Sequence, residues 1–145
     1  ERIQRDDVDI ISGSRYLEVH PENDMPPKER QAINRQVTEE LHDALGIEIT
    51  DAFCGFKAYR VETLDAFNFD VNGYAFPIQF WVQAAARQLR ICEIPVRMIY
   101  NDPNRTFGGQ LDDPVKRLDH YRAVLCNELR KNEALLPNAR EHVPC

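Results

Sequence analysis

The chain has 145 residues, of which 43% are hydrophobic and 29% are charged, as expected for a single globular domain. Its formal net charge of −6 argues against general nucleic-acid binding. No apolar run approaches the roughly 18–20 residues of a membrane span. Because the cations of this acidic chain gather in or beside polar loops, we expect a small anionic ligand.

The cysteines indicate free thiols in a reducing compartment. Cys54, Cys92, Cys126 and Cys145 form no Cys-x-x-Cys pair, and none has a histidine at zinc-ligand spacing. We therefore expect a cytoplasmic protein in which all of them are reduced. The chain lacks an initiator Met and leads almost directly into an apolar strand, so we also expect a fragment of a longer protein.

The first half of the chain predicts a strand, a helix and a second strand. Residues 7–12 are rich in β-branched side chains and run into a Gly-Ser-Arg turn. After a polar loop over 20–27, apolar residues at every fourth position predict a helix from Lys28 to Leu45. Gly46 is expected to end that helix. Residues 56–60 favour another strand, and one or two helical turns follow it.

The second half predicts two helices around one strand. Residues 77–89 form a strongly apolar helix with Pro77 in its first turn. Residues 90–100 predict a strand, which Pro95 assigns to a sheet edge or a bulge. The loop 101–114 is long for a compact domain, and such loops are often functional. A last helix begins at Pro114, and the polar tail after it is expected to fray.

This order of elements indicates an α/β or α+β fold. It offers at most three strands, whereas a sheet usually has about 4–6. The shortage supports the expectation that a partner half is missing.

Side chains that suit a phosphate group follow the first strand and begin the first helix. Ser14 and Arg15 lie at a strand end, where open α/β sheets bind ligands, and arginine can grip a phosphate with two donors. Arg30 and Asn34 share one helix face near its N-terminus, where an anion is favourable. An ordinary turn and a solvated helix face are the alternatives when each motif is taken alone.

The stretch DAFCGFKAYR (51–60) and the later loop NRTFGGQL (104–111) add further candidates. Asp51 can serve as a general base toward an acceptor hydroxyl, or it can cap a turn through backbone amides. Cys54 has no histidine near it in sequence, so we expect a half-buried thiol and no nucleophile. Arg105 can close over a phosphate, or it can simply project from a loop.

Taken in order, four stretches resemble the C-terminal half of family 2 glycosyltransferases, and in particular the dolichol-phosphate mannose synthase-like, or polyprenyl-phosphate, branch. They are DIISGSRYLE, RQAINRQVTEELHDALGIEITDAFCGFKAYR, GYAFPIQFWVQAAARQLRICEIPVRM and NRTFGGQL. The resemblance implies the C-terminal, acceptor-side part of a GT-A (Rossmann-like) fold over residues 1–136. It also implies that the nucleotide-binding N-terminal half is absent and that residues 137–145 are a polar tail.

The resemblance further implies that a sugar is transferred from a nucleotide-sugar donor to an acceptor, either a lipid phosphate or a hydroxyl compound. In this family, Arg15, Arg30 and Asn34 match contacts to the acceptor phosphate, and Ser14 lies in the same Gly-Ser-Arg turn. Asn34 stands where the lipid-phosphate enzymes often have serine.

Two other positions carry implied roles. Asp51 and Gly55 match the loop that lines the acceptor side of the sugar site, with Asp51 as the candidate catalytic residue. Arg105 matches the arginine of a mobile loop that contacts the donor diphosphate.

The family usually requires Mg²⁺ or Mn²⁺, whose ligands are expected in the absent half, so no metal ligand is predicted in this chain. The piece alone is therefore not expected to transfer sugar. A homodimer and peripheral contact with a membrane surface are both compatible with the resemblance. The alternative function is a non-catalytic phosphate-binding or interaction module.

Overall fold

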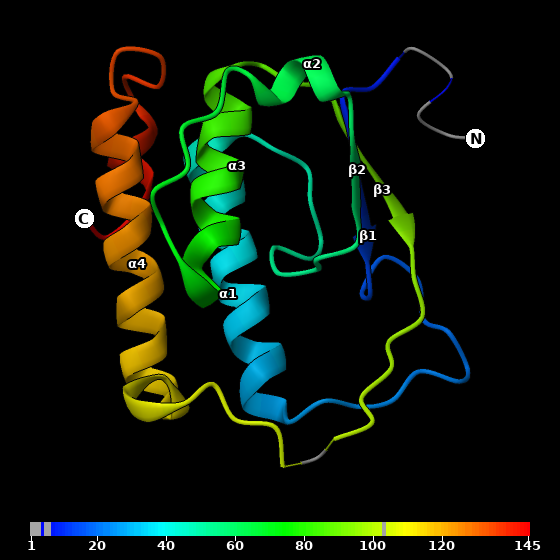
Figure 1. The fold of residues 1–145 in the computed structure, drawn as a ribbon. Coiled ribbons are helices and arrows are strands. Elements are labelled where there is room, and N and C mark those ends of the chain that lie inside the picture. Colours follow the sequence, from blue (N-terminus) through cyan, green and yellow to red (C-terminus); the bar gives the residue numbers. More distant parts are fainter. Residues whose placement is uncertain (1–3, 5–6, 103) are drawn as a thin grey trace.

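A computed structural model describes residue 4, residues 7–102 and residues 104–145. The elements follow the predicted order of strand, helix, strand, short helix, helix, strand and long helix (Figure 1). They are β1 (Ile10–Ser14), α1 (Lys28–Leu45), β2 (Lys57–Tyr59), α2 (Val61–Leu64), α3 (Phe76–Ala86), β3 (Ile91–Pro95) and α4 (Pro114–Lys131), with 3₁₀ turns at Gly73–Ala75, Gly109–Asp112 and Ala139–His142.

Within the described residues the sheet has three strands in the order β2-β1-β3. The central strand β1 is antiparallel to β2 and parallel to β3. Helices α1, α3 and α4 lie on one side of the sheet in Figure 1. Since β3 ends at Pro95 and lies at an edge of the sheet, the position predicted for this proline is confirmed.

Strand β1 lies later in the sequence than predicted. The Gly-Ser pair expected in a turn continues the strand, because Gly13 pairs with Ile94 and Ser14 with Pro95. A Cβ at Gly13 would lie 3.0 Å from Val96 Cγ1 and 3.2 Å from Phe56 Cδ1, so any side chain here would require these neighbours to shift. The turn begins at Arg15, one step beyond the sheet.

The core lies between the sheet and the helices. Trp81 is fully buried, and its indole Nε1 donates a hydrogen bond to the Ala52 carbonyl at 2.9 Å, which ties α3 to the segment before β2. The predicted apolar face of α1 is buried as expected. Other large core side chains are Ile10, Ile33, Val37, Leu41, Ile78, Phe80, Tyr121, Leu125 and Leu129. Among the described residues, no helix is both long and apolar enough to cross a membrane.

The ends of the two long helices agree with the sequence. Gly46 takes a left-handed conformation with φ 65°, and its N–H donates to the His42 carbonyl at 2.8 Å. At the start of α4, the Asp113 carboxylate accepts hydrogen bonds from the amides of Val115 and Lys116.

The expectations for the tail and for the cysteines are wrong. Residues 137–145 do not fray, because Ala139 and Val143 are buried in the core beside α1. Cys126 and Cys145 form a disulfide whose Cα atoms lie 5.6 Å apart, while Cys54 and Cys92 remain free. Spacing along the sequence could not show this pairing, because it depends on the tail folding back along α4.

The sheet face opposite the helices carries small and apolar side chains. Ile11, Ala58 and Cys92 are in register on this face, since their neighbours Ile10, Tyr59 and Ile91 point into the core. Phe56 covers Gly13 on the same face and is 68% exposed. No helix within the described ranges covers this face (Figure 1).

We predict that reducing the disulfide lowers the free energy of unfolding by about 2–3 kcal/mol, because the Cys126–Cys145 bond restricts the unfolded chain over a separation of 19 residues. Urea denaturation with and without reductant measures the change. Cys145→Ser, which cannot form the bond, should be as stable with and without reductant as the wild type is after reduction. Cys92→Ser should respond to reductant like the wild type. An unchanged wild-type midpoint after reduction would contradict the prediction.

Candidate functional site

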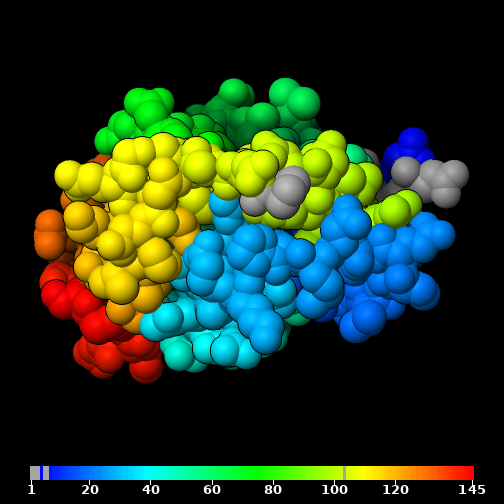
Figure 2. Space-filling view, turned by 90° about the horizontal axis from the view of Figure 1, so that it is seen from below, coloured from blue at the N-terminus to red at the C-terminus, as the bar shows by residue number. Residues whose placement is uncertain are grey.

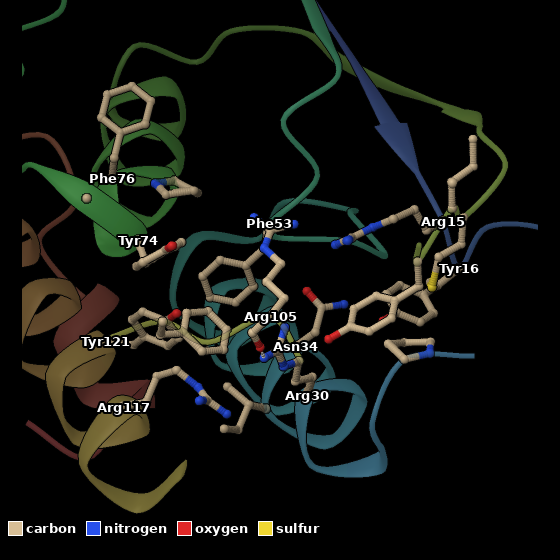
Figure 3. Close-up of a pocket in the computed structure, with 18 residues that line it drawn as sticks. Arg15, Tyr16, Arg30, Asn34, Phe53, Tyr74, Phe76, Arg105, Arg117 and Tyr121 are labelled. Carbon is tan, nitrogen blue, oxygen red and sulfur yellow. Dashed lines mark hydrogen bonds between the residues drawn. The ribbon is translucent and has the colours of Figure 1, made fainter. Parts of the chain in front are cut away.

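A cavity of about 330 Å³ opens beside the end of β1, the first turns of α1 and the loop before α4 (Figure 3). Among the described residues, its walls combine arginines with aromatic and apolar side chains and include no acidic residue. The residues that form it are Arg15, Tyr16, Pro26, Arg30, Ile33, Asn34, Phe53, Gly73, Tyr74, Phe76, Pro77, Met98, Ile99, Tyr100, Arg105, Phe107, Arg117 and Tyr121. Such a lining suits an anion that is attached to an apolar group.

Arg15 is held in the cavity wall by a paired carboxylate. Its Nε lies 2.7 Å from Asp51 Oδ2 and its Nη2 lies 2.8 Å from Asp51 Oδ1, in a two-pronged contact. The Arg15 amide also donates to Asp51 Oδ2 at 3.1 Å. The Asp51 carboxylate raises the pKa of Arg15 above its ordinary value. The Asp51 side chain is fully buried, whereas Arg15 keeps 32% of its side chain exposed toward the cavity.

A second carboxylate fixes the segment that carries Asp51. Glu93 of β3 accepts hydrogen bonds from the Thr50 amide at 2.8 Å, the Thr50 hydroxyl at 2.6 Å and the Asp51 amide at 3.3 Å. The Ser14 hydroxyl lies 2.6 Å from Thr50 Oγ1 and accepts from the amides of Tyr16 and Leu17. Ser14 therefore shapes the turn before the cavity and does not line it.

Arg30 and Asn34 project from α1 into the cavity, as their shared helix face predicts. Asn34 is 6% exposed, and its buried Oδ1 has no hydrogen-bond partner among the described residues. The buried Nε of Arg30 likewise lacks a hydrogen bond, although Glu29 Oε1 lies 3.6 Å away. Buried polar atoms without partners are rare, so these two are natural contacts for a polar ligand.

Arg105 comes from the loop between β3 and α4 and lines the cavity with Arg30 and Asn34. Its backbone carbonyl accepts a hydrogen bond from Arg30 Nη2. In Figure 2 this loop, in yellow, covers the surface beside the start of α1, in light blue. The structure thus brings together the cationic residues predicted from three separate stretches of sequence.

Besides Ser14, two more predicted residues lie away from the cavity. Gly55 is exposed in the turn before β2, and nothing lies within 4 Å of a Cβ placed there. Asp51 lies behind Arg15, and its oxygens accept from Arg15 and from the Phe53 amide at 3.2 Å. These contacts favour a positioning role for Asp51, and its role as a general base stays a prediction.

Sequence reasoning missed Arg117 and the aromatic walls. Arg117 is 2% exposed on the first turn of α4, where it pairs with Glu29 and donates to the Leu111 carbonyl at 2.8 Å. The signal in the sequence that could have identified Arg117 as a cavity residue is its position just after the glycine-rich loop. Tyr121 lies one turn later in α4, and burial raises its pKa to about 12. Burial also raises the pKa of Tyr16, so both phenols stay protonated at neutral pH.

The cavity does not fit a divalent cation. No carboxylate or imidazole lines it, and no group of three or more His, Cys, Asp or Glu within the described residues could hold a metal ion. That the intact enzyme binds Mg²⁺ or Mn²⁺, as the resemblance implies, stays a prediction.

In sequence, the chain is similar to an undecaprenyl-phosphate mannosyltransferase from Micrococcus luteus, with 30% identity over 121 residues. The match covers 79% of this chain and 49% of the relative, so the chain spans about half the length of that curated relative. No family model matches the chain, and no solved structure matches it. The likeness relates the chain to a glycosyltransferase in general terms, while the GT-A fold stays a prediction.

We predict that Asp51→Ala lowers the free energy of unfolding by about 3 kcal/mol, because it leaves the Arg15 charge without its buried partner. Chemical denaturation of Asp51→Ala, Arg15→Met and the double variant measures the coupling between the two side chains. The free energy of unfolding of the double variant should fall by less than the sum of the decreases in the two single variants. Asp65→Ala, at an exposed site, serves as the control, and additive losses for the pair would refute the coupling.

Proposed function

We propose that this chain forms the acceptor side of a glycosyltransferase that moves a sugar from a nucleotide-sugar to a lipid phosphate. The observation that carries the proposal is the arginine-lined cavity at the end of β1. It is built by a chain that is similar to an undecaprenyl-phosphate mannosyltransferase over 79% of its length.

The chemistry of the cavity supports a phosphate attached to an apolar chain. Arg15 and Arg30 offer planar donors for phosphate oxygens, and the buried Arg117 adds positive charge to the same wall. Ile33 and Met98 belong to the apolar part of the same wall and suit the first units of a prenyl chain.

A phosphate acceptor also agrees with the environment of Asp51. A phosphate monoester is already ionised at neutral pH, so it attacks without a general base. In the proposed step, an acceptor phosphate oxygen forms a bond to the anomeric carbon of the donor sugar. The bond from that carbon to the diphosphate breaks, and its electron pair leaves with the nucleotide diphosphate. An acceptor hydroxyl would instead need a base, and Asp51 is the nearest candidate.

Arg105 is proposed to stabilise the charge that develops on the leaving diphosphate. It lines the cavity from the loop before α4, where its guanidinium can donate hydrogen bonds to an anionic group. A divalent cation would supply further neutralisation when bound. Its ligands, like the nucleotide site, are proposed to lie in another part of a longer protein.

A non-catalytic phosphate-binding module would show the same arginines but would not need a second half. The helix-free sheet face with the exposed Phe56 supports the glycosyltransferase reading, because such a face suits packing against a further segment. Sugar transfer by the longer protein, measured with a nucleotide-linked mannose donor and undecaprenyl phosphate, separates the two functions. A longer protein that binds the phosphate but transfers no sugar would favour the module.

We predict that farnesyl phosphate, a short prenyl phosphate, binds this chain and that Arg30→Gln weakens the binding about tenfold or more through loss of a charged hydrogen bond. Isothermal titration calorimetry measures the affinity. Arg35→Gln is the matched control, because Arg35 lies on the same helix but not in this cavity. Farnesol should not compete, and equal binding of farnesol and farnesyl phosphate would refute the phosphate site.

We further predict that Arg105→Ala in the longer protein lowers turnover by about 10²–10³-fold, as expected when a donor to developing charge is removed. The unfolding temperature should stay unchanged, because the Arg105 residue is exposed. Arg97→Ala, another exposed arginine that precedes the same loop, is the control. Wild-type turnover in Arg105→Ala would exclude the proposed role.

A further inference from the structure

The side chain of Phe107 lies against the guanidinium groups of two arginines from different helices. The Arg117 Cζ is 4.1 Å from the centre of the Phe107 ring, and the Arg30 Cζ is 4.6 Å from it. Tyr74 meets the same ring edge-on, with the two ring centres 4.9 Å apart. Figure 3 shows Arg30 coming from α1 and Arg117 from α4. The ring therefore joins the loop to both helices.

The backbone around Phe107 is held by the same arginines. Arg30 Nη2 donates to the carbonyl of Arg105, two residues before Phe107. Arg117 Nη1 donates to the carbonyl of Leu111, four residues after it. Both halves of the loop are thus tied to the helices that flank the cavity.

The turn after Phe107 is shaped to aim its ring inward. The amides of Phe107 and Gly108 donate to Asp112 Oδ1 at 2.7 and 3.1 Å. Gly108 and Gly109 both have positive φ, at 88° and 59°, which glycine adopts without strain. This backbone geometry accompanies the placement of the Phe107 ring against the two arginines.

Glu29 keeps the two arginines in place beside each other. Its Oε2 pairs with Arg117 Nη2, and its Oε1 lies 3.6 Å from Arg30 Nε. One carboxylate thus offsets the repulsion between two cations that share an aromatic ring.

We propose that Phe107 is a positioning residue, which latches residues 104–112 to Arg30 and Arg117 and so presents Arg105 at the cavity. The role of Arg105 in this statement rests on the proposed function. The latch depends on the π face of the ring, because the face of an aromatic ring attracts a cation electrostatically. A leucine would keep the apolar bulk and lose that attraction.

Amide hydrogen exchange of the whole chain tests the latch. In Phe107→Leu, the loop amides that are protected in the wild type are expected to exchange about tenfold faster. Phe107→Trp retains a π face and should restore protection to within about threefold of the wild type. A protected loop in the leucine variant, or a loop as open in the tryptophan variant as in the leucine one, would overturn the proposal.

Two further variants separate the latch from general loosening. Arg30→Met should speed the exchange of the same amides. Phe107→Leu should increase the exchange rate less in the Arg30→Met protein than in the wild type. Val115→Ala removes a 67% exposed side chain that follows the loop and does not line the cavity, so it should leave the exchange unchanged. Purely additive effects of Arg30→Met and Phe107→Leu would count against the latch.

Farnesyl phosphate binding distinguishes failure of this proposal from failure of the proposed function. If the wild type does not bind the probe but Phe107→Leu opens the loop, the phosphate site fails and the latch stands. If the probe binds and the loop exchanges equally in both proteins, the latch fails and the phosphate site stands.

Discussion

The ion pair between Arg15 and Asp51 connects the sheet to the cavity. Burying the Asp51 carboxylate removes a charge from water, which is costly unless every oxygen is paired. The Arg15 guanidinium and amide and the Phe53 amide provide that pairing. Glu93 holds the adjoining backbone through Thr50, so β1, β3 and the segment before β2 meet at one point. The position of the cationic wall depends on this junction.

An acidic protein can present a cationic cavity because its carboxylates lie behind the arginines. Asp51 stands behind Arg15, and Glu29 beside Arg30 and Arg117, while the lining found in the described part of the chain contains no acidic residue. The net charge of −6 therefore says little about the local field at the site. This arrangement orients the guanidinium groups in the cavity wall.

The parts that could be predicted were those with local causes. The four-residue period and Gly46 defined α1, and Asp113 with Pro114 defined the start of α4. Arginines that follow a strand or begin a helix were recognisable as anion contacts. The disulfide and the buried tail were not predictable, because pairing and burial there depend on contacts between distant segments.

By itself, the sequence determined the order of elements, the ends of the long helices and the chemical types available to a site, since propensities and capping act within a few residues. Only the tertiary structure decided which of those residues meet. Arg30 and Arg117 are 87 positions apart in sequence, and in the structure both contact the Phe107 ring. Asp51 is buried behind Arg15. Side-chain contacts over such separations arise from packing of whole elements, which no local pattern encodes.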